Sequence, residues 1–178
     1  MTYQDIIDKY YPSDSLRRVI YMRHCGQVAS LALEIAGNKN LPLSREAVMT
    51  AAMLHDIGIF MTSANDIGCF GDAPYIMHGV LGGELLRNEG MGEELARVAE
   101  RHTGAGITAD DIARQQLPLP PGDYMPETLL ERLICYADKF YSKSGAMERK
   151  PFDKVCKSME RISPDTLKRF LILHREFS

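Results

Sequence analysis

The spacing of apolar residues predicts a protein built almost entirely from helices. Within several segments an apolar residue recurs every three or four positions, which is the period of a helix that buries one face. These segments cover residues 16–35, 44–54, 76–88, 92–102, 126–141 and 163–173. No stretch alternates apolar and polar residues as a half-buried strand does, so we predict an all-α fold.

The chain also carries signals for where helices begin and end. Side chains that can accept a hydrogen bond from the first free N–H groups of a helix stand at Ser13, Ser44, Thr108 and Ser163. We expect the helix that Ser44 opens to carry His55-Asp56 and to end at Gly58, because glycine is common just past a helix C-terminus. We expect Pro126 to open the helix over 126–141, since proline is tolerated in the first helical turn.

The connecting segments are consistent with one domain over residues 1–178. A chain of 178 residues can bury a core without disulfides or other cross-links. We place its core at about residues 20–140 and a C-terminal helical extension at 150–178. Residues 61–75 are rich in glycine, asparagine and aspartate, which is typical of a loop, and this loop can form a lid.

Charge is unevenly distributed along the chain. The net charge of −3 gives no case for nucleic-acid binding. Residues 1–138 carry 11 basic and 19 acidic side chains, whereas residues 139–178 carry 10 basic and 5 acidic ones. The basic segment is either a solvated helix pair docked on an acidic body or a source of cations that attract an anionic substrate.

Three features point to a reduced, cytoplasmic protein. The four cysteines form no C-x-x-C pair. Residues 1–8 include acidic side chains where a signal peptide has a basic start. No run approaches the roughly 18 apolar residues of a membrane span, so we expect no membrane partner.

Four of the five histidines and two aspartates form an ordered series that suggests a metal site. The series is His24, His55, Asp56, His78, His102 and Asp138. His24 shares a helix face with apolar Val28, and Asp138 shares one with Ile134, so both are expected to point into the core. Taken singly, each has an ordinary explanation, such as a core histidine or an ion pair of Asp138 with Lys139 or Arg101. His174 stands outside the series and is read as structural.

The donor set of this series indicates which metals fit. Four imidazoles and two carboxylates suit Fe, Mn, Co, Ni or Zn, and they are too rich in nitrogen for calcium. Six side chains exceed a closed tetrahedral site. They fit two divalent ions bridged by one carboxylate, with positions left open for water.

The ordered pattern resembles the HD-domain superfamily of metal-dependent phosphohydrolases. The resemblance rests on His24, the pair His55-Asp56 and Asp138, with Ile57-Gly58 completing the His-Asp-Ile-Gly variant over about residues 20–140. It implies a single helical bundle with the metal site at its centre.

The two remaining histidines resemble those of stand-alone members with two metal ions. By this resemblance His24, His55 and Asp138 bind one ion, His78 and His102 bind the second, and Asp56 bridges the two. A role in cyclic-di-GMP hydrolysis is not expected, because the lysine that the HD-GYP subgroup has soon after His-Asp is replaced by Ile59-Phe60, and its Gly-Tyr-Pro signature is absent.

The resulting hypothesis is a phosphohydrolase that cleaves a phosphomonoester, phosphodiester or phosphoanhydride of a nucleotide. Asp56 is expected to position a metal-bridging hydroxide that attacks phosphorus, and Arg101 and Lys139, which adjoin ligands, to contact the phosphate. Candidate substrates are 2′,3′-cyclic phosphates, dinucleoside polyphosphates and nucleotide monophosphates. Two alternatives stay open: a non-catalytic nucleotide-sensing module and a di-iron oxygenase on the same scaffold.

Overall fold

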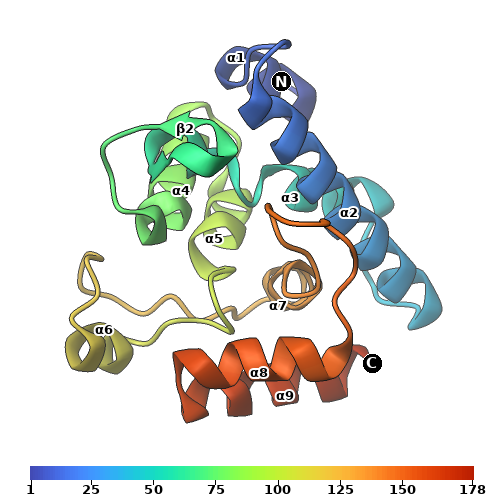
Figure 1. Cartoon of the computed structure of the whole chain (residues 1–178). Coiled ribbons are helices and arrows are strands. Elements are labelled where there is room, and N and C mark those ends of the chain that lie inside the picture. Colours follow the sequence, from blue (N-terminus) through green and yellow to red (C-terminus); the bar gives the residue numbers. More distant parts are fainter.

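The computed structural model describes all residues 1–178 and confirms the all-α class (Figure 1). The α-helices are α1 (Tyr3–Tyr10), α2 (Leu16–Asn38), α3 (Arg45–Leu54), α4 (His78–Asn88), α5 (Glu93–Arg101), α6 (Ala109–Gln115), α7 (Leu129–Asp138), α8 (Phe152–Ile162) and α9 (Pro164–Phe177). Short 3-10 helices lie at η1 (Ile57–Met61), η2 (Asn65–Ile67) and η3 (Tyr75–Met77). One small antiparallel hairpin of β1 (Ser63–Ala64) and β2 (Cys69–Phe70) completes the fold, within the segment expected to be a loop.

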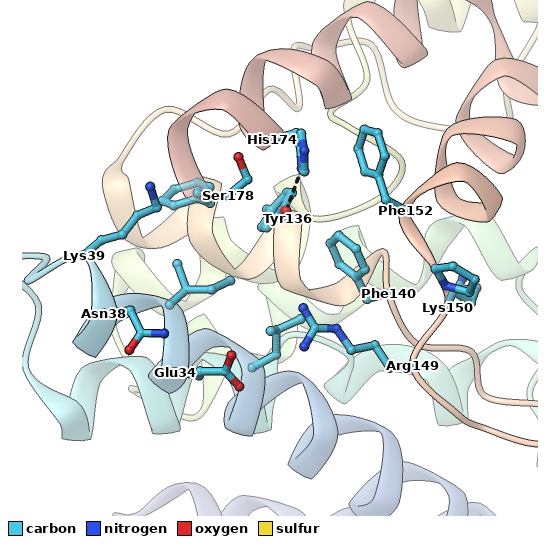
Figure 2. A pocket seen from close by; sticks show the side chains of 14 residues that line it. Glu34, Asn38, Lys39, Tyr136, Phe140, Arg149, Lys150, Phe152, His174 and Ser178 are labelled. Carbon is cyan, nitrogen blue, oxygen red and sulfur yellow. Dashed lines mark hydrogen bonds between the residues drawn. The ribbon is translucent and has the colours of Figure 1, made fainter.

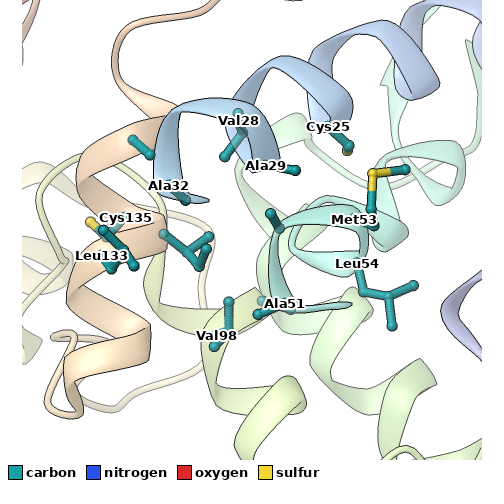
Figure 3. Close-up of a cluster of buried hydrophobic side chains, with 14 of the residues drawn as sticks. Cys25, Val28, Ala29, Ala32, Ala51, Met53, Leu54, Val98, Leu133 and Cys135 are labelled. Atoms are coloured by element: carbon teal, nitrogen blue, oxygen red, sulfur yellow. The ribbon is translucent and has the colours of Figure 1, made fainter. Parts of the chain in front are cut away.

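Helix α7 is the centre of the packing. It contacts α2, α3, α5 and α9, and Figure 1 shows it surrounded by these helices. Where α7 faces α2, α3 and α5, many of the side chains are small or branched, as Ala29 and Ala32 of α2, Ala51 of α3, Val98 of α5 and Leu133 of α7 show in Figure 3. Small residues allow the helix axes to approach closely, and all of the buried apolar residues except Met147 form one contiguous cluster of 37.

Three of the expected helix caps are confirmed. Ser44 accepts a hydrogen bond from the Ala47 N–H at 3.0 Å and opens α3. Thr108 opens α6 in a capping box with Asp111, in which each side chain accepts from the other residue's N–H. Ser163 opens α9, with proline in its first turn.

Three expected boundaries are wrong. Ser15 rather than Ser13 caps α2, because its hydroxyl is the one that reaches the N–H of Arg18. Pro126 does not open α7: the helix begins at Leu129, where Thr128 and its capping box supply the partners that proline cannot. The same helix ends at Asp138, three residues before the expected end at 141.

Gly58 does not end a helix. Helix α3 stops at Leu54, and Gly58 lies inside η1. Its backbone is not left-handed, so the conformational freedom of glycine is not what the position needs. The requirement is space, which is described with the site below.

The basic C-terminal segment contains the expected helix pair. Helices α8 and α9 pack side by side across one end of the molecule (Figure 1). Phe170 of α9 stacks on Tyr136 of α7, with ring centroids 5.7 Å apart, and thereby ties the pair to the central helix. The four cysteines form no disulfide. No helix combines the length and the apolar character that crossing a membrane requires.

Candidate metal centre

The structure brings together all six residues of the histidine and aspartate series, and all six are buried. Two groups can each hold a metal ion, because their ligand atoms lie within 4.8 Å of one another. The first group is His24, His55, Asp56 and Asp138, and the second is Asp56, His78 and His102. Asp56 is the only member of both groups.

Most of these residues lie at helix ends that meet near the middle of the fold. His55 and Asp56 follow α3, His78 is the first residue of α4, and His102 follows α5. Asp138 is the last residue of α7, whereas His24 lies inside α2 on its buried face. Five helices therefore supply the cluster, and residues 114 positions apart in sequence come into contact.

Two glycines let the backbone segments that carry these residues approach closely. A Cβ atom at Gly58 would lie 2.2 Å from the carbonyl oxygen of His78 and 2.5 Å from the nitrogen of Gly82. A Cβ atom at Gly79 would lie 2.7 Å from the carbonyl oxygen of Ala99. Glycine at both positions lets η1, α4 and α5 meet, which brings Asp56, His78 and His102 together.

The backbone fixes the orientation of three imidazoles. The Nδ1 atoms of His55, His78 and His102 lie 2.6–2.7 Å from the carbonyl oxygens of the residues three positions earlier. Since a carbonyl only accepts, each Nδ1 donates, and Nε2 is left to face the cluster. Metal-binding histidines are commonly held in this way, with the second ring nitrogen anchored outside the metal shell.

The Nε2 atoms of His78 and His102 face each other, and neither carries a proton. Their Nε2 atoms are 3.0 Å apart. Burial and the neighbouring His102 lower the pKa of His78 to about 3, and burial also lowers the pKa of His102. Both rings are therefore neutral, and with each Nδ1–H bound to a carbonyl, two Nε2 lone pairs point at one another. A cation between them turns this repulsion into coordination.

The two oxygens of Asp56 face different partners. Oδ2 lies 3.2 Å from Nε2 of His24 and 3.3 Å from that of His55. Oδ1 lies 3.2 Å from Nε2 of His102 and 3.5 Å from that of His78. Each oxygen thus faces the imidazoles of a different group.

Unsatisfied buried atoms show that the donor set fits divalent ions. Both oxygens of Asp56, Nδ1 of His24 and Nε2 of His55 are buried without a hydrogen-bond partner, a costly arrangement in a low-dielectric interior. Burial lowers the pKa of His55, but Asp56 and its other neighbours outweigh burial and raise it well above its ordinary value. The cluster therefore attracts positive charge, and its four imidazoles and two carboxylates suit the metals named above.

One residue at the centre was missed by sequence reasoning. The ammonium of Lys143 lies 2.7 Å from Oδ2 of Asp56. Burial opposes its charge, yet Asp56 outweighs burial and raises the pKa of Lys143 well above its ordinary value. Lys143 belongs to the irregular segment between α7 and α8, whose sequence has no periodicity, so the only signal was the excess of cations after residue 138.

The two cations expected to contact phosphate lie elsewhere or are already engaged. Arg101 pairs with Glu127 at 2.9 Å and with Glu131 at 3.1 Å, and it makes no ion pair with the six clustered residues. Lys139 is buried, 2.6 Å from Oδ2 of Asp138, and donates to the carbonyl of His102 at 2.8 Å. Lys139 thus helps to hold Asp138 and the backbone of His102 in place, while Arg101 joins α5 to the segment that begins α7.

A cavity of about 480 Å³ opens beside Asp138 and leads to the cluster. Its wall includes three cations, Lys139, Lys143 and Lys150, together with the hydroxyl side chains Tyr75, Tyr141, Ser142 and Ser144. The hairpin segment forms part of the same wall through Ser63, Ala64, Asp66 and Ile67. The expected loop 61–75 therefore borders the entrance, and its action as a lid stays a prediction.

Comparison with known proteins identifies the family. The sequence profile described as the HD domain matches residues 21–142, more than half of the chain. The chain belongs to the HD-domain superfamily of metal-dependent phosphohydrolases. The matched range contains all six residues of the cluster.

Relatives of this HD-domain protein share its sequence over most of its length. An uncharacterised protein of Methanocaldococcus jannaschii is 36% identical over 88% of this chain and 87% of its own. A tRNA (cytidine(56)-2′-O)-methyltransferase of Picrophilus torridus is 33% identical over 89% of this chain, and one of Thermoplasma volcanium is 33% identical over 78%. The chain spans only 42% and 35% of these two methyltransferases. No solved structure matches the chain.

Proposed function

We propose that this HD-domain protein hydrolyses a phosphate ester or anhydride of a nucleotide at a centre of two divalent ions. His24, His55 and Asp138 would hold one ion, His78 and His102 the other, and Asp56 would bridge them. The observation that carries this proposal is the arrangement of Asp56, whose two oxygens each lie among a different pair of imidazole nitrogens.

Paired divalent ions supply, when bound, an acidified water and neutralisation of charge on a phosphoryl group. The residues of the chain then have distinct tasks. Asp56 fixes the position of both ligand groups relative to each other. Lys139 neutralises the oxygen of Asp138 that faces away from the histidines. Burial excludes bulk water, which strengthens every electrostatic contact inside the site.

Lys143 is the residue best placed to contact the substrate phosphate. It lines the cavity and reaches Asp56 from the same side. Once cations neutralise Asp56, its ammonium is free to bind a phosphoryl oxygen, and a lysine is a common point-charge partner of phosphate. This assignment replaces Arg101, whose charge is held by two glutamates.

The cavity favours an anionic substrate of nucleotide size. Three lysines line it against two acidic residues, Asp66 and Asp138. Two relatives have names that concern the ribose 2′-oxygen of a tRNA cytidine. For this reason RNA-derived compounds with 2′,3′-cyclic phosphate ends belong among the first substrates to be tested, beside dinucleoside polyphosphates and nucleoside monophosphates.

The test combines metal content with turnover. Protein purified without chelator is expected to contain about two ions per chain, the His78→Ala variant about one, and the Asp56→Asn variant almost none. His174→Ala, which removes a histidine outside the cluster, serves as the control for metal content. A panel of phosphate compounds is then assayed with added Mn or Fe.

The possible results separate the alternatives. Release of phosphate or of a nucleoside phosphate, lost in Asp56→Asn, supports the proposal. Two ions without turnover on any phosphate compound contradicts hydrolysis and favours the sensing module. Consumption of dioxygen by the iron-loaded protein favours the oxygenase instead.

A further inference from the structure

A second and larger cavity lies apart from the metal centre. It has a volume of about 720 Å³ and is bounded by the C-terminal part of α2, the end of α7, residues 149–152 and the end of α9 (Figure 2). None of the six clustered residues lines it. Its size falls within the range of roughly 300–1,000 Å³ that is usual for small-molecule sites.

Aromatic rings form one side of this cavity. The rings of Phe152 and His174 stack with centroids 4.0 Å apart and planes inclined by 26°. His174 is held by a hydrogen bond of 2.9 Å between its Nδ1 and the hydroxyl of Tyr136, drawn in Figure 2. Phe152 remains 39% exposed although it is a large apolar side chain. A flat ring from a ligand can extend this stack at low cost, because aromatic faces pair favourably.

Positive charge without an acidic partner gathers around the same cavity. Lys39, Arg149 and Lys150 line it, and none of the three forms an ion pair or donates a side-chain hydrogen bond. Arg149 instead lies over the ring of Phe140, 5.5 Å from its centroid. Other arginines do have carboxylate partners, as Arg132 has Glu176 at 2.8 Å. Burial and the neighbouring lysines lower the pKa of Lys150, which means that its charged form is disfavoured. An anion bound beside it would stabilise this charge.

Polar groups face the aromatic wall from the opposite side. Glu34 and Asn38 of α2 line the cavity on the side opposite Phe152, as Figure 2 shows. Their carboxylate and amide can bond the edge of a heterocycle or the hydroxyls of a sugar. The cavity thus combines a flat aromatic surface, hydrogen-bonding groups and free cations.

We propose that this cavity is a second nucleotide-binding site, separate from the metal centre. The base stacks beside Phe152, Glu34 and Asn38 bond the base edge or the ribose, and the phosphates lie between Arg149, Lys150 and Lys39. The proposal does not depend on hydrolysis at the metal centre, although Lys150 also lines the cavity that leads there.

The test measures nucleotide binding where the metal centre cannot contribute. Isothermal titration calorimetry of AMP, ADP and ATP is performed on the Asp56→Asn variant in the presence of EDTA, with ribose 5-phosphate and pyrophosphate as probes that lack a base. One site per chain is expected. We expect Arg149→Ala to weaken nucleotide binding about tenfold, the loss of one charge-assisted contact, and Phe152→Leu to weaken it severalfold while leaving pyrophosphate binding unchanged.

Arg161→Ala is the matched control, because Arg161 is an exposed arginine of α8 outside the cavity. Thermal unfolding of each variant verifies that it folds. Absence of nucleotide binding to the folded Asp56→Asn variant overturns the proposal. Equal effects of Arg149→Ala and Arg161→Ala overturn it too, and so does pyrophosphate binding as tight as that of ADP. Hydrolysis by the wild-type protein is assayed separately, so its failure leaves this result intact.

Discussion

The ammonium of Lys143 lies 2.7 Å from Oδ2 of Asp56, the carboxylate shared by both candidate metal groups. The two side chains come from segments 87 positions apart, and both are largely buried, with side-chain exposures of 15% and 0%. In a protein without ions, this ammonium is the charge that compensates Asp56. By the proposed function, ions bound at Asp56 would leave the same ammonium available to a phosphate in the cavity.

Lys143→Met is therefore expected to affect the metal-free protein and the enzyme reaction in different ways. Without metal, the change leaves a buried carboxylate without its counter-charge and lowers the free energy of unfolding by about 3 kcal/mol. Added Mn is expected to recover most of this loss, because the ions neutralise Asp56. With metal, the KM for substrate is expected to rise about tenfold or more. Urea unfolding with and without Mn, followed by steady-state kinetics, measures both effects.

Lys157→Met is the control for this variant, since Lys157 is an exposed lysine of α8 without an ion pair. It is expected to change stability by less than about 0.5 kcal/mol. If Lys143→Met lowers stability equally with and without Mn, the hypothesis that metal ions replace Lys143 as the counter-charge of Asp56 is wrong.

Removal of metal is expected to destabilise the wild-type protein strongly. Ions that bind only the folded state add about 4 kcal/mol at a free concentration 1,000-fold above their Kd. For a chain of this length that corresponds to roughly 10 °C in Tm. EDTA should lower Tm by this amount, and Mn should restore it. The Asp56→Asn variant should show no such dependence, and a metal-dependent shift of equal size in that variant would argue against a bridging role.

The contact between α6 and α9 gives a pH-dependent prediction far from the metal centre. Burial raises the pKa of Asp111, but hydrogen bonds from Thr108 and the charge of Arg169, 2.7 Å away, outweigh burial and lower it below its ordinary value. A carboxyl whose pKa is lowered on folding stabilises the protein above its unfolded pKa of about 3.9 and loses this contribution as pH falls through the folded value.

Asp111→Asn should accordingly lower the free energy of unfolding by about 1–2 kcal/mol at pH 7. The difference from wild type should shrink as the pH falls below about 4. Asp110→Asn, which removes an exposed acid paired with Arg114, should cost less than about 1 kcal/mol. Urea titrations at pH 7, 5 and 3 measure these differences, and a constant gap across the series would contradict the assignment.

The helical class could be anticipated from the spacing of apolar residues, and the convergence of the six clustered residues from their ordered pattern, which the HD-domain family shares. Asp138 on the stripe of Ile134 and His24 on that of Val28 had to point inward, whatever the connections between the helices. Lys143 could not be anticipated, since it lies in an irregular segment where no period relates sequence position to direction. Its long side chain contacts Asp56 only because the folded chain brings the two segments together.

Helix boundaries show a different limit of sequence reasoning. Ser13 and Ser15 offer the same hydroxyl, and Pro126 and Thr128 are both common where helices begin. Only the path of the preceding chain decides which of them caps α2 or α7. The ion pairs of Arg101 could not be anticipated for a similar reason, because adjacency to His102 says nothing about Glu127 and Glu131, which its guanidinium meets in the fold.

Gly58 could be explained from the sequence either as a helix end or as a site of close packing, because glycine is common at both. In the structure, close packing is the reason for glycine at this position. A methyl group at this position would meet the carbonyl oxygen of His78 at 2.2 Å. Gly58→Ala should therefore separate η1 from α4, lower the free energy of unfolding by about 1–3 kcal/mol and displace His78 from Asp56. Metal content is expected to fall from about two ions per chain toward one.

Gly26→Ala is the control, since a Cβ on Gly26 of α2 meets nothing within 4 Å, and it should stabilise the helix by about 0.5–1 kcal/mol. Full metal content in a folded Gly58→Ala variant would show that His78 does not need this close approach.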